Sequence, residues 1–335
     1  MKKFILFILF FLIEALNLHS QTNVSTTIGQ FLLIEPSARL SAMGNSGTAI
    51  EGDVMGVYYN PGAISSITTI KSQFTHSNWL AGIKYNYAII AIPINELSGV
   101  VLNLSSLRSG DILVRTVELP LGTGEYYSAN DLSLGIGYGT KLTDRVNVGM
   151  QIFYLKQSIM HSQVSGLGLN LGTQYRLTDG GIILGASLSN YGTRDNFKGR
   201  DLRIRYDQNQ EINGDNSSLP AEYFTEEYGL PILFRIGLKL PVIKDEKNNL
   251  IFAVDAVHPN NNTESINLGG EYTYSETFSI RAGYQNLFEK DSEVGLTLGT
   301  GLVIELTGLD LYFDYCWTKY GRLGNVQRMT LGFSY

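Results

Sequence analysis

The stretch DLSLGIGYGTKL, residues 131–142, decides the fold class because its side chains alternate between two chemical kinds. From Leu132 to Tyr138 every second residue is apolar, and the residues between them are serine or glycine. Successive side chains of a strand point to opposite faces of the sheet, so this period of two predicts a β-strand with one apolar face. The other face consists of small and polar residues, which suits a wet or plugged interior better than a dry core.

The same alternation recurs along most of the chain and predicts fourteen wall strands. Strands of a soluble β-sandwich also alternate, but these segments are long, even in number and bordered by tyrosine and tryptophan. Those features favour an all-β fold, a 14-stranded antiparallel transmembrane β-barrel. The expected strands are residues 71–78, 82–93, 98–108, 128–142, 146–159, 164–177, 181–190, 231–241, 249–258, 264–274, 277–286, 293–305, 309–317 and 325–335.

The connections between these strands are unequal in length, as outer-membrane barrels require. The two longest, residues 109–127 and 191–230, are expected at the same, outer end, with residues 111–118 in an outer hairpin rather than in the wall. The first half of residues 191–230 is basic and the second half is acidic. This connection is therefore expected to dock a partner or to fold on itself.

The N-terminus has the organisation of a secretory signal peptide. Lys2 and Lys3 precede an apolar run at residues 4–13, and the polar residues around Ser20 follow. The run is too short to span a bilayer as a helix, so we expect residues 1–20 to be cleaved during export. The remaining chain is expected to divide into an N-terminal plug or hatch at residues 21–70 and a barrel at residues 71–335.

Within the expected plug, residues 31–64 are rich in glycine, alanine and serine and do not alternate as strands do. Short helical pieces are expected near residues 37–43 and 53–59, the second ended by proline, with the segment inside or under the barrel. The alternative is an ordinary N-terminal loop and helix of a soluble β-protein. The expected plug motif consists of Arg39, Gly44, Asp53, Asn60 and Pro61.

Several charged residues occupy the small and polar face of the expected strands. Charges of both signs in a confined lumen should pair with each other or with the plug, because an unpaired buried charge is costly. The alternative is that they line a path for a ligand or ion. The expected lumen-facing residues are Arg176, Arg235, Asp255, Glu271, Arg281, Glu305 and Asp314.

The sequence carries little that points to catalysis. A formal net charge of -6 argues against a nucleic-acid partner. The histidines have no metal-ligand spacing, and no nucleophile elbow, phosphate loop or dinucleotide fingerprint is present. His76 and Ser77 are adjacent on one expected strand and point to opposite faces, so they cannot form one site. We expect a protein that is not an enzyme, with no catalytic, cofactor-binding or metal-binding residues.

Several short blocks of the sequence resemble the PorV/PorQ family of outer-membrane proteins, over essentially the whole mature chain. The N-terminal blocks are Phe31-Leu32, Ala38-Arg39, Ala42-Met43-Gly44, Asp53 and Tyr59-Asn60-Pro61, followed by SQFTHSNWL at residues 72–80. The later blocks are Asp144-Arg145, YLKQ at residues 154–157 and LSNYG at residues 188–192.

The resemblance implies a fold similar to the FadL long-chain fatty-acid transporters, whose hatch carries an Asn-Pro-Ala motif. Here the motif reads Asn60-Pro61-Gly62, with Ala63 one place later. The resemblance further implies the outer membrane of Bacteroidetes and a role in type IX protein secretion or cell-surface attachment. The implied partners are outer-membrane lipid, the C-terminal domains of secreted cargo and other secretion components. A FadL-like transporter of hydrophobic small molecules is the alternative.

Overall fold

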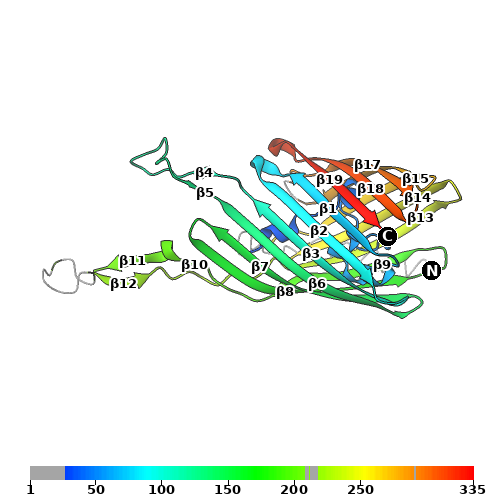
Figure 1. The fold of residues 1–335 in the computed structure, drawn as a ribbon, viewed down its shortest axis with the longest axis horizontal. Helices are drawn as coiled ribbons and strands as arrows, with labels where there is room; N and C mark the ends of the chain where they lie inside the picture. Colours follow the sequence, from blue (N-terminus) through cyan, green and yellow to red (C-terminus); the bar gives the residue numbers. More distant parts are fainter. Residues whose placement is uncertain (1–26, 208–210, 212–217, 290–291) are drawn as a thin grey trace, which may run out of the picture.

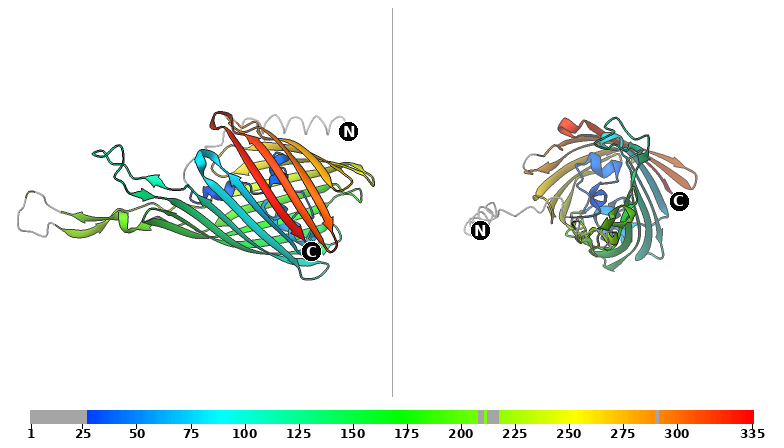
Figure 2. Two further views of the ribbon diagram at one scale, coloured as in Figure 1. Left: turned by 45° about the horizontal axis from the view of Figure 1, so that its top comes forward. Right: turned by 90° about the vertical axis from the view of Figure 1, so that its left-hand side faces the viewer.

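The computed structural model describes residues 27–207, 211, 218–289 and 292–335. These residues form a closed, tilted β-barrel of fourteen antiparallel strands (Figure 1). A smaller N-terminal segment lies inside the barrel, as the view along the barrel axis shows (Figure 2). The predicted fold class is therefore confirmed. The predicted signal peptide, residues 1–20, lies outside the described residues.

The wall follows the chain order, so each strand pairs with its neighbours in sequence. The barrel closes where β1 pairs with β19, from Lys71 opposite Ser334 to Asn78 opposite Gln327. The wall strands are β1 (Lys71–Asn78), β2 (Lys84–Pro93), β3 (Ser98–Arg108), β6 (Ala129–Thr143), β7 (Val146–Ile159), β8 (Ser162–Arg176), β9 (Ile183–Gly192), β13 (Leu233–Lys244), β14 (Asn248–Pro259), β15 (Ser265–Tyr274), β16 (Phe278–Leu287), β17 (Leu296–Leu306), β18 (Leu309–Lys319) and β19 (Asn325–Ser334).

The alternation of the sequence becomes a difference between the outside and the inside of the barrel. On β6, Leu134 and Ile136 are 48% and 58% exposed, whereas Ser133 between the apolar positions is buried. The apolar side chains therefore face outward, and the small and polar ones face the lumen. This is the reverse of a soluble β-protein and is what a wall surrounded by lipid requires.

The two ends of the barrel differ in the length of their connections. Residues 109–128 and 193–232 join wall strands at the same end, which we call the outer end; the opposite, inner end has short turns such as residues 144–145 and 307–308. The outer connections contain the pairs β4 (Ile112–Leu113) with β5 (Tyr126–Tyr127) and β11 (Arg203–Tyr206) with β12 (Leu219–Glu222). Both pairs project beyond the rim (Figure 1). The short β10 (Lys198–Gly199) adds to the outer end of β8.

The segment inside the barrel, residues 27–70, contains only short helical pieces. These are the 3-10 helix η1 (Gln30–Leu33), α2 (Ala38–Ala42), α3 (Gly56–Tyr59) and the 3-10 helix η2 (Pro61–Ser66). We call this segment the plug. In the described ranges no helix is long and apolar enough to cross a membrane.

The structure departs from the sequence-based expectations in local detail. The strand expected at residues 82–93 begins only at Lys84, because residues 80–82 form a short 3-10 helix in which Ala81 has a φ of 55°. Pro61 follows the end of α3 as expected, but it also starts η2, because a proline needs no N–H at the first helical position. Asn60 between the two helices is extended.

Candidate functional site in the barrel lumen

The plug runs through the lumen from one end of the barrel to the other. Near the outer end, Ile28 N donates to Gly229 O at 3.0 Å. At the inner end, Ile70 and Tyr335 exchange two backbone hydrogen bonds of 3.2 and 2.8 Å, immediately before β1 begins. The lumen is therefore occupied along its length, and any functional site inside the barrel includes plug residues.

A chain of ion pairs joins the plug to strands β15, β16 and β18 of the wall. Arg39 of α2 donates from Nε and Nη2 to the two carboxylate oxygens of Glu271 on β15, at 2.8 and 2.6 Å. Its Nη1 also lies 3.3 Å from Asp53 Oδ2. On the wall, Arg281 of β16 bridges Glu271 and Asp314, both at 2.5 Å. The structure thus brings five predicted residues into one alternating network.

Two carboxylates, those of Glu271 and Asp53, compensate the partly buried charge of Arg39. Because the acidic and basic groups alternate and share hydrogen bonds, they compensate each other's desolvation. This arrangement is a structural tie and not a chain of free charges along an open path.

A second tie joins the plug to β14 through Thr48, which the sequence did not single out. The backbone N and the hydroxyl of Thr48 donate to Asp255 Oδ2 at 2.9 and 2.7 Å. Asp255 is fully buried. Thr48 has no sequence signal of its own, because only the folded structure places its hydroxyl beside a wall carboxylate.

Asn60 connects the plug to itself and to the wall. Its Oδ1 accepts from Gly62 N at 2.9 Å and caps η2, while its Nδ2 donates to Thr48 O and to Thr173 O of β8, both at 2.8 Å. Pro61 is buried against Gly149 of β7. These two motif residues therefore set the contact between the plug and the adjacent wall.

Wall glycines allow the plug backbone to approach the sheet. A Cβ at Gly172 would overlap Asn60 Oδ1, and a Cβ at Gly149 would overlap the carbonyl of Pro61. Gly44 has a φ of 64°, and a side chain there would overlap the Leu268 carbonyl on β15. At Gly149 and Gly44 the close contact is between two backbones, whereas at Gly172 the wall backbone meets the side chain of Asn60.

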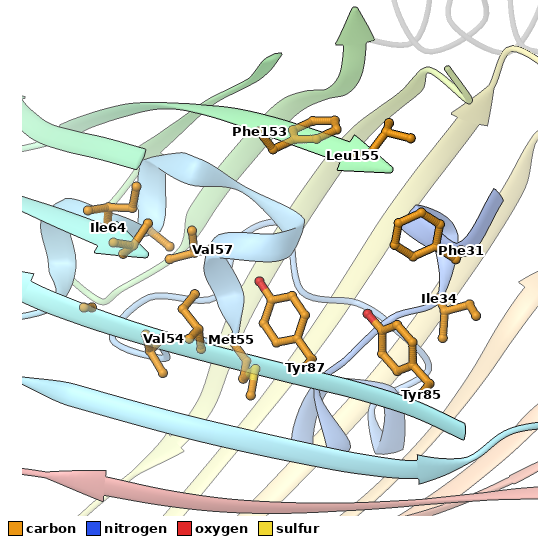
Figure 3. Close-up of a cluster of buried hydrophobic side chains, with 14 of the residues drawn as sticks. Phe31, Ile34, Val54, Met55, Val57, Ile64, Tyr85, Tyr87, Phe153 and Leu155 are labelled. Carbon is orange, nitrogen blue, oxygen red and sulfur yellow. The ribbon is translucent and has the colours of Figure 1, made fainter. Parts of the chain in front are cut away.

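An apolar cluster fills the space between the plug and the strands on the opposite side (Figure 3). Val54, Met55 and Val57 of the plug pack with Tyr85 and Tyr87, which point inward from β2. Toward the outer end the cluster continues with Phe31 and Ile34 of the plug and Phe153 and Leu155 of β7. The plug is thus held by apolar packing on one side and by ion pairs on the other.

Two predicted lumen residues lie near the inner end and not in the buried network. Arg176 is exposed and pairs with Glu51 of the plug at 3.1 Å. Glu305 is exposed near the inner end of β17. Arg235, by contrast, is buried beside Tyr58 and Tyr59 of the plug. Strand alternation indicates which face a side chain occupies but not how deep along the barrel it lies.

Each mouth of the barrel opens into a cavity. The outer cavity, of about 850 Å3, is lined by Phe31, Glu35, Trp79 and Tyr320 among others. The inner cavity, of about 830 Å3, is lined by Glu51, Arg176 and Lys239 among others. The described part of the chain holds no group of three or more His, Cys, Asp or Glu side chains able to bind a metal ion.

Solved structures place this barrel in a known class. It is similar to a Pseudomonas aeruginosa FadL homologue, with 12% identity, a TM-score of 0.55 and coverage of 94% of this chain and 98% of the other. It is also similar to the Ralstonia pickettii toluene transporter TbuX, with 10% identity, a TM-score of 0.56 and coverage of 90% and 98%. A third similar structure is the Pseudomonas putida toluene transporter TodX, with 12% identity, a TM-score of 0.54 and coverage of 94% of this chain and 99% of the other. The fold is that of a FadL-like outer-membrane barrel.

The family follows from the sequence match. Residues 17–257 match the family model described as type IX secretion system protein PorV, so the chain belongs to the PorV family. A comparison with curated protein sequences finds no significant match. The protein is an outer-membrane barrel of type IX secretion, which confirms the predicted family, function and location.

Proposed function

We propose that the outer end of this barrel binds secreted cargo, through the cargo's C-terminal domain, together with other type IX secretion components for attachment at the cell surface. The observation that carries the proposal is the pair of projections at the outer rim. Tyr223 and Phe224, which follow β12, are 61% and 90% exposed, and Val117 and Leu121 between β4 and β5 are 101% and 92% exposed. Exposed apolar side chains on one end of a membrane protein, outside the lipid-facing wall, are typical of a protein-binding surface.

The charges of the longer projection support the same proposal. Arg203 of β11 stands opposite Glu222 of β12, so part of the basic and acidic halves fold on each other. At the base of the projection, Lys198 Nζ lies 2.9 Å from Asp195, and His161 lies 3.0 Å from Asp201. These exposed pairs lie at the base of the projection, next to the rim at which a partner would bind.

In this proposal the barrel is a binding partner and not an enzyme. The charged groups in its lumen serve to hold the plug. The lumen network of Arg39, Glu271, Arg281 and Asp314 leaves no nucleophile and base in contact. Outer-membrane lipid is the other predicted partner. In this proposal it surrounds the exposed apolar face of the wall strands.

A FadL-like conduit for hydrophobic small molecules is a second candidate, favoured by the outer cavity. Phe31, Ile34 and Leu233 form an apolar part of its lining, and two similar solved structures are described as toluene transporters. The family match and the tight contact between the plug and the wall glycines favour secretion instead.

Binding of cargo C-terminal domains to the purified barrel tests the proposal directly. Replacement of Tyr223 and Phe224 by serine should weaken binding at least tenfold. The matched control replaces Ile94 and Leu97 by serine, because these exposed apolar residues lie in an inner turn. Binding that is unchanged in the first variant, or lost equally in both, would contradict an outer docking surface.

Deletion of the gene separates the two candidate functions. If cargo fails to reach the cell surface in the deletion strain and uptake of toluene is unchanged, secretion is supported. If cargo reaches the surface normally while uptake fails, the protein is a conduit.

A further inference from the structure

Arg235 of β13 is a buried positive charge that makes no direct ion pair among the described residues. The residue is 4% exposed. Among the described residues no carboxylate oxygen lies within 4.0 Å of its guanidinium, whereas Arg281 of β16 contacts two carboxylates. Glu35 and Asp255 interact with Arg235 only electrostatically, from a greater distance. Because an uncompensated charge in a protein interior is costly, a counter-charge at this position would be strongly favoured.

The contacts that Arg235 does make leave most of its donors unused. Its guanidinium carbon lies 5.5 and 5.6 Å from the ring centroids of Tyr58 and Tyr59, and Nη1 donates to Ser189 Oγ at 3.2 Å. Together with a hydrogen bond to Tyr58, that makes two hydrogen bonds for a group with five N–H donors. Arg328, which also has no ion pair among the described residues, instead donates to three oxygen atoms. Arg235 is therefore the less satisfied of the two.

A cavity of about 30 Å3 adjoins Arg235, enough for one or two water-sized groups. Its lining contains no acidic residue. Instead, a row of amides crosses it: Gln151 donates to Asn103 Oδ1 at 2.6 Å, and Asn170 donates to Gln151 Oε1 at 2.8 Å. The Asn170 oxygen accepts from the Asn190 backbone N at 2.7 Å.

The hydrogen bonds of this row determine which polar atoms remain free. All three amide oxygens already accept a hydrogen bond, and the amide nitrogen of Asn103 donates one of its two N–H groups to the Tyr87 hydroxyl. The second N–H group of Asn103 and the unused donors of Arg235 therefore border a small cavity. A cavity that offers donors and a positive charge, and no negative charge, matches an anion.

We propose that this cavity binds a small monovalent anion, a halide such as chloride or the carboxylate of a small acid, between the guanidinium of Arg235 and the amide of Asn103. The site lies directly below the outer cavity. Leu233 and Arg235 are successive inward-facing residues of β13, the first lining the outer cavity and the second the anion cavity. The anion therefore enters from the outer mouth, past Leu32 of the plug. The bound anion neutralises Arg235 and adds a further tie between the plug tyrosines and the wall.

Bromide is the probe for the first test, because it replaces chloride and scatters X-rays anomalously. Crystals of the full barrel in bromide should show an anomalous peak within hydrogen-bond distance of Arg235. The peak should be absent from R235Q and also from S133L, which keeps the arginine and fills the cavity from β6. A wild-type crystal without this peak, or with a peak that persists in S133L, would overturn the proposal.

Thermal unfolding in detergent is the second test and distinguishes the sources of the anion. At constant sodium concentration, replacing gluconate by chloride should raise Tm in the wild type in a saturable way, and S133L should lose this rise. R176Q removes an exposed arginine at the inner mouth and should keep the full rise. A rise with formate alone identifies a carboxylate ligand. No rise with either anion means that the cavity holds only water, which would overturn the proposal.

Discussion

Arg39 of the plug and Glu271 of β15 form a two-point ion pair, with Nε and Nη2 at 2.8 and 2.6 Å from the two carboxylate oxygens. Paired in this way, guanidinium and carboxylate fix both the distance and the orientation of the two groups. Because Glu271 also receives Arg281 of β16, the plug is joined to two adjacent strands through one carboxylate. The plug is therefore expected to behave as part of the barrel and not as a mobile gate.

Replacing Arg39 by alanine should loosen the plug more than the wall. Glu271 keeps its ion pair with Arg281, whereas the buried carboxylate of Asp53 loses its ion pair with Arg39, so the expected loss of stability is about 1–3 kcal/mol. Limited proteolysis should then cleave the plug faster than in the wild type, and conductance through the barrel in planar bilayers should rise. R145A removes an exposed arginine that pairs with Asp179 and should change neither measurement. Equal protease resistance of R39A and the wild type would argue against this tie.

A methyl group at Gly172 should disturb the contact between the plug and strand β8. The added Cβ would overlap Asn60 Oδ1 and the ring of Pro61. We expect G172A to lower Tm and to expose the plug to protease, while the heat-modifiable shift of the barrel on gels persists. G180A is the control, because a Cβ there would meet only Thr178 Oγ1, at 3.6 Å. Equal stability of G172A and G180A would contradict the close contact between Gly172 of β8 and the plug.

Replacing Asn60 by alanine removes a helix cap and two bridging hydrogen bonds. The expected loss is about 1–3 kcal/mol, because the carbonyls of Thr48 and Thr173 lose a buried donor. N60D keeps the acceptor for Gly62 N but places a carboxylate against the same two carbonyls. We therefore expect N60D to be destabilised at least as much as N60A. Denaturant unfolding of N60A, N60D and the exposed control N262A measures the difference. A stable N60D would show that the amide nitrogen contributes little.

A charge on the outward face of β6 tests the contact with lipid. Ile136 is 58% exposed and lies between other apolar side chains of the wall. An arginine near the bilayer midplane costs about 2–4 kcal/mol, whereas near the interface the cost is small. I136R should therefore reduce the amount of folded barrel recovered in bilayers. L121R, in the exposed outer connection, should fold as the wild type does. Equal folding yields of the two variants would place Ile136 outside the lipid-facing band.

The sequence by itself determined the barrel, because the pattern that defines a wall strand depends only on residues that are neighbours in the chain. Two-residue alternation, as between Leu132 and Tyr138, needs only neighbouring residues to define an outward apolar face and a small, polar inward face. Strand lengths and turn residues then led to fourteen strands and to the position of the two long connections at one end. Helix-ending rules also placed the end of α3 before Pro61.

Only the tertiary structure decided which inward-facing groups meet. Arg281 and Arg176 both follow the inward alternation, yet one is buried between two carboxylates and the other pairs with Glu51 at an exposed mouth. The difference depends on strand tilt and on the path of the plug, which bring together residues such as Thr48 and Asp255 that are far apart in sequence. Alternation defines the direction of a side chain, whereas its depth in the barrel and its partners depend on contacts across the whole fold.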